Sequence, residues 1–265
     1  MPKVKIDGVN LYYEIHGDEF PLLMIQGLSE NVYWWDLPMI DELSKHFKTV
    51  IFDNRGVGRS DNLDGDLSIE LMAADVLGLM DALNIAQAHI LGHSLGGMIA
   101  QEMALKFPER IKKLVLCSTS CGGSKAELPS IETQRILGKF SAKEHTRDLT
   151  EEGMFHIFTK KFMDENPKFM EKKVDDILII PTGPATFKAQ MSAWMRYNSC
   201  RKLKNISIPT LIVHGKQDIL VPSSNGELLA EKIPTSEIIY FDSNAHIIHT
   251  EAPDKFLRVL LKFLK

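Results

Sequence analysis

Residues 88–100 read Ala88-His89-Ile90-Leu91-Gly92-His93-Ser94-Leu95-Gly96-Gly97-Met98-Ile99-Ala100, an apolar run that leads into a glycine-rich turn. The run from Ala88 to Leu91 is typical of a buried strand, and the segment from Leu95 to about Phe107 predicts a helix that ends at Pro108. The turn between them matches G-x-S-x-G, whose central residue adopts a strained backbone conformation with its side chain clear of the sheet. Short patterns also arise by chance, but the motif requires this strand-turn-helix context. Ser94 is therefore predicted to be a nucleophile.

Composition narrows the classes of partner. The 265 residues carry a net charge of −4 without a dense basic run, which argues against nucleic-acid binding. Residues 1–7 lack the apolar segment of a secretory signal, and no apolar run approaches the ~18 residues of a membrane helix. Cys117, Cys121 and Cys200 lack zinc-like spacing, so we expect free thiols in a cytoplasmic protein. No metal or organic cofactor is expected, and the sequence does not indicate an oligomeric state.

Strand-like and helix-like segments alternate around this stretch, which predicts a mostly parallel sheet covered on both sides. Residues 121–205 interrupt the alternation with helix-like segments only. We therefore predict one α/β domain, residues 1–120 and 206–265, with a helical lid formed by residues 121–205. Expected strands are a hairpin at 3–16 and single strands at 21–25, 49–53, 88–91, 113–117, 209–214 and 237–241. Expected helices are 33–45, 68–83, 95–107, 227–232 and 253–264 in the core, and about 130–140, 148–164, 168–180 and 185–199 in the insertion.

A neutral serine needs a base within hydrogen-bond reach, and that base needs a third group to orient it. Functional loops of an open parallel sheet lie at the carboxyl ends of its strands. Asp218 follows the strand that ends at His214, although an aspartate in such a turn is often only structural. The loop after the strand at 113–117 offers no acid, only Ser118, Thr119 and Ser120. Asp218 is therefore the better candidate.

His246 is the candidate base, and His249 is its rival three residues later. His246 lies nearer the end of the strand at 237–241 and should reach the edge of the sheet, whereas His249 is expected in the first turn of a helix. The order Ser94, Asp218, His246 is the one expected for this kind of sheet. Of the remaining histidines, His93 is interpreted as the variable residue of the turn at Ser94, and His214 lies at the end of a strand. The others are interpreted as surface or packing residues.

Attack by Ser94 on a carbonyl would create an oxyanion that needs donors already in place. The backbone N–H of Leu95 should be one of them. The second should be the backbone N–H of Leu28, on the loop after the strand at 21–25.

Several motifs together resemble the α/β-hydrolase-fold serine hydrolases over the whole chain. Besides the turn at Ser94, they are Asp53-Asn-Arg-Gly-Val-Gly-Arg-Ser60, His214-Gly-x-x-Asp218-x-x-Val221-Pro222 and His246-x-x-x-x-Glu251-x-Pro253. Within that family the chain is most similar to small esterases, enol-lactone hydrolases, perhydrolases and C–C bond hydrolases. It departs from the usual pattern at Gln26, where relatives carry a histidine before the glycine of the oxyanion loop.

The resemblance implies a hydrolase of carboxylic esters or lactones that forms an acyl-enzyme on Ser94. A C–C bond hydrolase of ring-cleavage diketones is the alternative, with Arg196 and Arg201 as candidate partners for the acidic ends of such substrates. A receptor that keeps the fold and turns its ligand over slowly is a third possibility. The insertion is rich in residues suited to an apolar pocket. They are Met154, Phe155, Phe158, Phe162, Met163, Met191, Trp194 and Met195.

Overall fold

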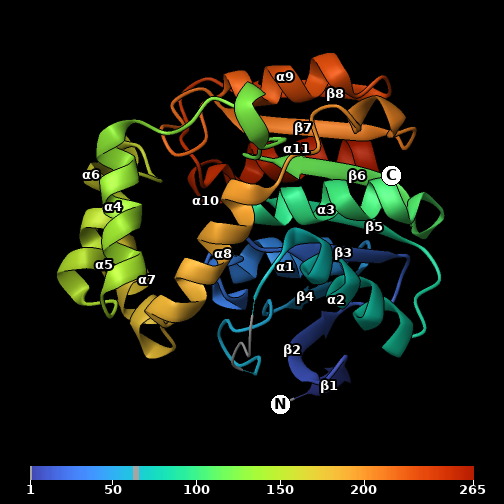
Figure 1. Ribbon diagram of the computed structural model, residues 1–265, viewed down its shortest axis with the longest axis horizontal. Helices are drawn as coiled ribbons and strands as arrows, with labels where there is room; N and C mark the ends of the chain where they lie inside the picture. The colour runs from blue at the N-terminus through green and yellow to red at the C-terminus, as the bar shows by residue number, and fades with distance from the viewer. Residues whose placement is uncertain (1, 62–65) are drawn as a thin grey trace.

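The computed structural model describes residues 2–61 and 66–265, and an eight-stranded sheet forms the centre of this part of the chain (Figure 1). The spatial order is β1-β2-β4-β3-β5-β6-β7-β8; β2 pairs antiparallel with β1 and β4, and the other pairings are parallel. This confirms the mostly parallel sheet and the N-terminal hairpin. The strands are β1 (Lys3–Ile6), β2 (Val9–His16), β3 (Pro21–Ile25), β4 (Lys48–Phe52), β5 (Ala88–His93), β6 (Ile111–Cys117), β7 (Thr210–Gly215) and β8 (Ser236–Phe241).

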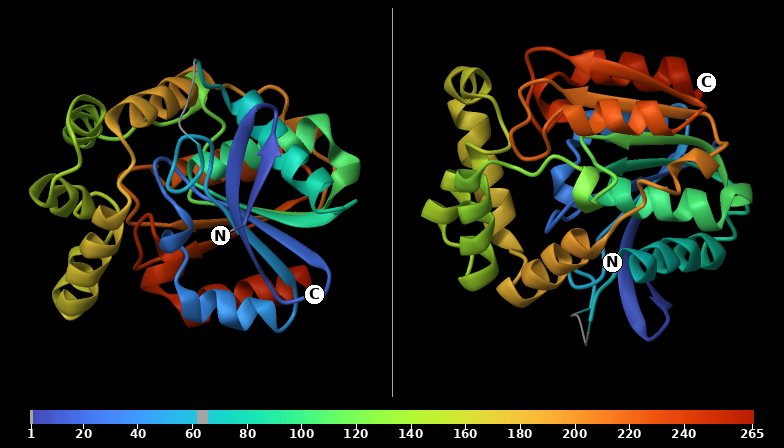
Figure 2. Two further views of the ribbon diagram at one scale, coloured as in Figure 1. Left: turned by 90° about the horizontal axis from the view of Figure 1, so that it is seen from below. Right: turned by 45° about the horizontal axis from the view of Figure 1, so that its top comes forward.

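Helices cover both faces of the sheet, with α1 and α11 on one side and α2 and α3 on the other (Figure 2). The core helices are α1 (Leu37–Ser44), α2 (Ile69–Ala82), α3 (Leu95–Lys106), α9 (Ser224–Lys232), α10 (Ile248–Glu251) and α11 (Pro253–Leu264). The insertion contributes α4 (Ile131–Ala142), α5 (Arg147–Met154), α6 (Lys160–Glu165), α7 (Pro167–Ile179) and α8 (Pro184–Arg196). Short 3₁₀ turns are η1 (Val32–Trp34), η2 (Pro108–Arg110), η3 (Gly123–Lys125) and η4 (Leu203–Asn205).

Neighbouring residues of each central strand point to opposite faces, and both faces are apolar. In β3, Leu23 and Ile25 pack with α2 and α3, whereas Leu22 and Met24 pack with α1 and α11. The same division holds for Ile90 and its neighbour Leu91 in β5. A strand buried on both faces needs a continuous apolar run, which explains why these strands could be recognised in the sequence.

The five helices α4 to α8 lie between β6 and β7 in the chain and gather at one end of the sheet (Figures 1 and 2). Helix α4 packs against α8 and α5, and α5 packs against α7. This arrangement agrees with a helical insertion into an α/β domain. That residues 121–205 act as a lid stays a prediction.

Two predicted helices are wrong in their extent. The expected helix at 33–45 consists of η1 and α1, separated because Pro38 is accepted only in the first turn of an α-helix. The expected helix at 148–164 is divided into α5 and α6. Thr159 accepts a hydrogen bond from the Phe162 N–H and so begins a new helix, and residues 155–158 form a turn.

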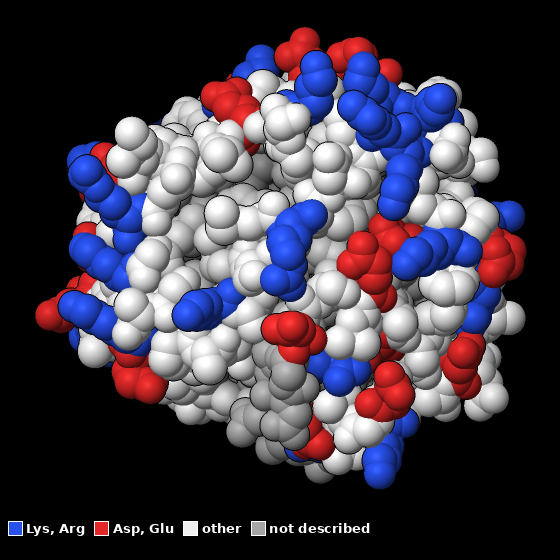
Figure 3. Space-filling model, viewed as in Figure 1, with Lys and Arg blue, Asp and Glu red and all other residues white. Residues whose placement is uncertain are grey.

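Acidic and basic side chains are interspersed over the face seen in Figure 3, and the area between the insertion and the sheet is mostly uncharged in that view. Within residues 2–61 and 66–265, no helix combines the length and hydropathy needed to cross a bilayer. Cys117, Cys121 and Cys200 are buried and free, as expected for thiols.

Candidate active site

Ser94 lies between β5 and α3 with a positive φ of 53° and a ψ of −119°. An L-residue rarely adopts this conformation, and its cost is offset by the packing around it. A Cβ at Gly92 would collide with the Gly96 carbonyl, and one at Gly96 would collide with the Ile25 carbonyl. The backbone N–H of Ser94 donates to the Cys117 carbonyl of β6 (2.9 Å). The turn therefore has the sharp, glycine-dependent geometry that the motif predicts.

The side chain of Ser94 is partly exposed and borders two pockets. The larger encloses about 840 Å³, counting its open mouth, and lies between the sheet and helices α4, α5 and α7. The smaller encloses about 330 Å³ and is lined by Met98, Trp194 and both leucines of the predicted oxyanion hole. His246 lines the larger pocket with Ser94. A substrate bound at Ser94 would therefore have separate space for the two groups on either side of its reacting carbonyl.

Asp218 and His246 come together from loops after β7 and β8. His246 Nδ1 donates to Asp218 Oδ2 over 2.7 Å, and both side chains are almost fully buried. Gly215 allows this approach, because a Cβ there would collide with the carbonyls of Asn244 and Ala245. The Gln217 N–H also donates to the Asn244 carbonyl (3.0 Å). The glycine of the His214-Gly-x-x-Asp218 motif thus lets one loop lie directly against the other.

The Asp218 carboxylate is kept ionised. Burial opposes the charge, but the neighbouring His246 and hydrogen bonds from His214 and His246 outweigh it and hold the pKa of Asp218 well below its usual range. Its other oxygen accepts from the N–H groups of Leu220 (3.0 Å) and Val221 (2.8 Å). A fixed, ionised carboxylate directs the Nδ1 proton of His246 toward itself, which leaves Nε2 free to act as a base.

His249 and Asp242, which also lie near the end of β8, have different surroundings. His249 is buried in α10, where burial and the charge of His93 lower its pKa well below the usual value. Asp242 is exposed and pairs with Lys216 over 2.8 Å. The structure therefore brings Asp218 and His246 together and places His246 in one pocket with Ser94. In the described ranges, no hydrogen bond joins the Ser94 hydroxyl to His246. The catalytic roles stay predictions.

The loop after β3 runs close beside Ser94. A Cβ at Gly27 would lie 2.9 Å from the Ser94 Cβ, so only glycine fits at this position. The N–H of Gly27 donates to Glu30 Oε2 (2.9 Å), and the N–H of Ser29 donates to Gln190 Oε1 of α8 (2.7 Å). Among the hydrogen bonds of the described residues, none uses the Leu28 N–H between them. Leu28 can therefore offer its N–H to a ligand.

Sequence reasoning missed a buried polar group below Ser94, formed by Gln26, Glu30 and His93. With its amide oriented to satisfy its neighbours, Gln26 donates to Glu30 Oε2 (2.8 Å) and accepts from the Trp35 N–H (3.3 Å). His93 Nδ1 lies 3.0 Å from the same Glu30 oxygen. Gln26 therefore anchors the loop after β3, the predicted oxyanion loop, through its side chain. The signal available in the sequence was the unusual Gln26 itself, with an acid four residues later.

Glu251 explains the closing motif. Its Oε2 accepts from the Ala245 N–H (2.6 Å), and its Oε1 accepts from the Thr159 N–H of the insertion (2.6 Å). The N–H groups of His246 and Ile247 both donate to the Ile157 carbonyl, at 3.0 and 3.2 Å. The turn that divides the expected helix at 148–164 thus supports the loop that carries His246.

A metal site is not formed by the described residues: none of their His, Cys, Asp and Glu side chains gather in groups of three or more that could hold an ion. Two clusters of hydrogen-bonded polar groups lie close to Ser94 instead, one around Asp218 and one around Glu30.

Comparison with known proteins places this geometry in a family. A model of the alpha/beta hydrolase fold family matches residues 21–253. A protein of Azorhizobium caulinodans named "Putative carbamate hydrolase RutD" is 31% identical over 264 residues, which cover 99% of this chain and 98% of that protein. The 3-oxoadipate enol-lactonase 2 of Acinetobacter baylyi is 28% identical over 251 residues, covering 94% of this chain and 90% of that enzyme.

A solved structure gives the same result. The crystal structure of the enol-lactonase from Burkholderia xenovorans superposes with a TM-score of 0.89 at 26% identity, covering 99% of both chains. The match extends over the sheet and over the inserted helices, since it leaves only 1% of this chain uncovered. The chain therefore belongs to the alpha/beta hydrolase fold family, and its relatives identify it as a hydrolase.

Proposed function

We propose that the protein is a serine hydrolase that cleaves carboxylic ester or lactone bonds of small, largely apolar substrates. The observation that carries this proposal is the arrangement of three residues. Ser94 stands on a strained turn, and the wall of its pocket includes His246, which Asp218 holds at 2.7 Å. The enol-lactonases among the relatives support the same class of reaction.

In the proposed reaction, Ser94 Oγ attacks the carbonyl carbon while His246 Nε2 accepts the hydroxyl proton. The carbonyl oxygen becomes an oxyanion that the N–H groups of Leu28 and Leu95 stabilise. Collapse of this intermediate breaks the C–O bond, and His246 returns its proton to the leaving oxygen. Water, deprotonated by His246, then attacks the acyl-enzyme and releases the acid. The protein itself needs no cofactor for these steps.

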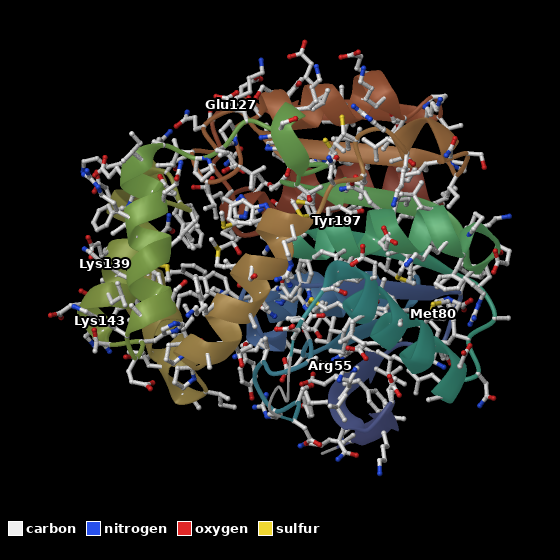
Figure 4. The ribbon with its side chains drawn as sticks, in the orientation of Figure 1. Arg55, Met80, Glu127, Lys139, Lys143 and Tyr197 are labelled. Atoms are coloured by element: carbon white, nitrogen blue, oxygen red, sulfur yellow. The ribbon has the colours of Figure 1, made fainter. Side chains whose placement is uncertain are left out.

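The larger pocket favours substrates without charge. None of the described residues that line it is Lys or Arg, and Glu30 is the acidic residue among them. Lys139 of α4 and Lys143, just after its end, are exposed on the outer side of the insertion (Figure 4). A carboxylate in the pocket would lose its water without gaining a cation, which is costly. The comparison uses a lactone that carries a carboxyl group, either free or masked as its methyl ester. We expect kcat/KM for opening of the lactone ring to be about tenfold or more higher for the methyl ester.

Arg196 and Arg201, the residues suggested to bind the acidic ends of a C–C hydrolase substrate, lie outside the larger pocket. Arg196 donates to the Leu67 carbonyl (2.7 Å) and to Ser192 Oγ (2.8 Å). A slow receptor remains distinct from an enzyme by its kinetics. Multiple rapid turnovers of a simple aryl ester support the enzyme, whereas a single slow covalent turnover supports the receptor.

The test uses wild type and Ser94→Ala with a panel of aryl esters, neutral lactones and carbamates of graded size. We expect Ser94→Ala to lose turnover of every substrate that wild type accepts, with an unchanged circular dichroism spectrum. Trp194→Ala, at the smaller pocket, serves as the matched control that should change the preference for substrate size without abolishing turnover. Full turnover by a folded Ser94→Ala protein would disprove the proposal.

A further inference from the structure

A buried carboxylate and a buried imidazole lie close to Ser94, the candidate nucleophile. Glu30 is 7% exposed and follows the oxyanion loop, and His93, fully buried, is the last residue of β5 before Ser94. Glu30 Oε2 and His93 Nδ1 are 3.0 Å apart. The proposed chemistry uses neither side chain, although a charged pair in such a position needs a reason, because burial of charge is costly.

The partners of His93 define its protonation. Nδ1 faces the Glu30 carboxylate, and Nε2 faces the backbone carbonyl of His246 at 3.3 Å. A carbonyl oxygen can only accept a hydrogen bond, and so can an ionised carboxylate. A proton on each ring nitrogen would satisfy both contacts, and this is the imidazolium state of His93. Burial opposes this charge, but Glu30 and the bond to His246 outweigh it and raise the pKa of His93 above its usual value.

The other titratable groups near His93 are compatible with this state. The ring of His249 in α10 is centred 5.1 Å away and stays neutral because burial lowers its pKa. The ring of His246 is centred 4.9 Å away, and the ionised Asp218 beyond it favours the cation. Cys117 is the register partner of His93 in β6, and burial raises the pKa of its thiol, so it carries no charge.

The pair connects three parts of the site. Glu30 Oε2 also accepts the N–H of Gly27 (2.9 Å), the residue before Leu28. His93 adjoins Ser94 along the chain and donates to the backbone of His246. Burial opposes ionisation of Glu30 too, but the charge and hydrogen bond of His93 lower its pKa below the usual value. The ion pair is thus hydrogen-bonded to the loop that carries Leu28 and to the loop that carries His246, and it lies next to Ser94.

We infer that Glu30 and His93 form a buried carboxylate–imidazolium pair that positions the Leu28 N–H, Ser94 and His246 relative to one another. This inference rests on the proposed function for its kinetic consequence, but not for the protonation of His93. Glu30 and His93 are positioning residues, because the proposed reaction uses neither side chain and their role is to hold the groups that it does use. A displacement of about 1 Å in such a site can cost ~10²-fold in rate.

The protonation is tested without catalysis, by two-bond ¹H–¹⁵N spectra of histidine-labelled Ser94→Ala protein. His93→Gln assigns the signal of His93 by its loss. We expect both His93 nitrogens to carry protons at pH 7.5, which lies above the ordinary imidazole pKa of about 6.5. A His93 ring with a single proton at that pH would overturn the inference, whether or not Ser94 is a nucleophile.

The positioning role is tested by the kinetics of Glu30→Gln, which keeps an oxygen for the Gly27 N–H but removes the charge. We expect kcat to fall about 10- to 100-fold with KM changed less than threefold. Without the Glu30 charge His93 should lose its proton at a lower pH, so kcat should begin to fall at a lower pH than in wild type. The double variant with His93→Gln should lose less than the product of the two single losses, because it leaves no unpaired charge. His89→Gln, at a buried histidine earlier in β5, is the matched control and should keep wild-type kcat.

The ion pair and the serine mechanism can be disproved separately. Turnover by Ser94→Ala would remove the proposed function and leave the spectra to decide the ion pair. A folded Glu30→Gln protein with wild-type kcat and an unchanged pH profile would overturn the positioning role while the serine mechanism stands.

Discussion

His246 and His249 are three residues apart, yet their surroundings differ in every respect that matters for a base. His246 has an ionised partner at 2.7 Å and lines the pocket, whereas His249 is not among the described residues that line it and has a pKa held low by burial. We expect His246→Ala to lower kcat on an aryl ester by ~10⁴–10⁶-fold, since base and nucleophile act as a unit. Asp218→Asn should cost about 10⁴-fold by favouring the wrong tautomer.

His249→Ala is the control for this experiment and should keep most of kcat in the folded protein. The reverse ranking of the two histidine variants would move the base to His249. A mild effect of Asp218→Asn would remove Asp218 as the orienting acid, which stopped-flow measurement of acylation would reveal directly.

Leu28 is proposed to act through its backbone, so the identity of its side chain should matter little. Leu28→Ala should retain most of kcat on a small ester, whereas Leu28→Pro deletes the N–H and should cost about 10²–10³-fold. Gln26→Leu should also impair kcat, because it removes the bonds to Glu30 and Trp35 that anchor the loop. A well-folded Leu28→Pro enzyme with wild-type kcat would place the second donor elsewhere.

The residues of the candidate triad could be found in the sequence because each follows a recognisable strand and belongs to a local motif. Ser94 depends on glycines two residues away on each side, and Asp218 follows a strand ending in His-Gly. The pair of Glu30 and His93 could not be found in this way. The two residues are 63 positions apart, and only the packing of the loop after β3 against β5 brings them together. His93 was therefore interpreted as a variable residue of the turn.

Helix α8 contacts the oxyanion loop as well as covering the site. Gln190 of α8 is fully buried and accepts from the Ser29 N–H (2.7 Å), and Thr182 donates to the Ser29 carbonyl (3.0 Å). Ser29 has a positive φ of 66°, so these bonds hold a strained residue next to Leu28. We expect Gln190→Leu to lower kcat about 10-fold or more with little change in KM, because it leaves the Ser29 N–H without its partner.

If residues 121–205 form a lid, changes in them should alter substrate range more than the reactivity of Ser94. The bonds to Ser29 limit this expectation to residues that do not contact the loop after β3. Trp194→Ala, one helical turn from Gln190, is the control and should change substrate preference while keeping Ser94 reactive toward a small fluorophosphonate. Equal labelling rates for Gln190→Leu and wild type would show that α8 does not support the loop.

The insertion shows why element boundaries were harder to predict than the sheet. The central strands are buried on both faces and stand out as apolar runs. Helices α4 to α8 are amphipathic, and no glycine or proline lies between α4 and α5 or between α5 and α6. The turn at 155–158 depends on long-range contacts, since Ile157 accepts from the backbone of His246 and Ile247 and Glu251 accepts from Thr159. These contacts join segments about 90 residues apart, which a local pattern cannot show.

For the whole molecule, the buried ionised groups predict how stability varies with pH. The pKa values of Asp218 and Glu30 are lowered in the folded protein, so their contribution is present above their unfolded values and is lost as the pH falls through the folded ones. The pKa of His93 is raised, so its contribution is complete below the unfolded value of about 6.5 and is lost as the pH rises through the folded one.

Urea unfolding between pH 6 and pH 9 tests the contribution of His93 to stability. We expect the free energy of unfolding of wild type to decline with rising pH over part of this range. The double variant Glu30→Gln with His93→Gln should show a smaller decline, because neither residue then titrates. The same slope in both proteins would mean that His93 is not the group responsible.

The central claim is that hydrolysis passes through an acyl group on Ser94. The direct measurement is to quench the enzyme with acid during turnover of an aryl ester and to analyse its tryptic peptides by mass spectrometry. The peptide of residues 60–106 contains Ser94 and lies between two cleavage sites, after Arg59 and after Lys106. We predict that this peptide gains the mass of the acyl group, that fragmentation places it on Ser94, and that it disappears when substrate is exhausted. The opposite result is an unmodified Ser94 at every quench time while substrate is rapidly consumed, in wild type and in Asp218→Asn alike. It would exclude an acyl group on Ser94 as an intermediate.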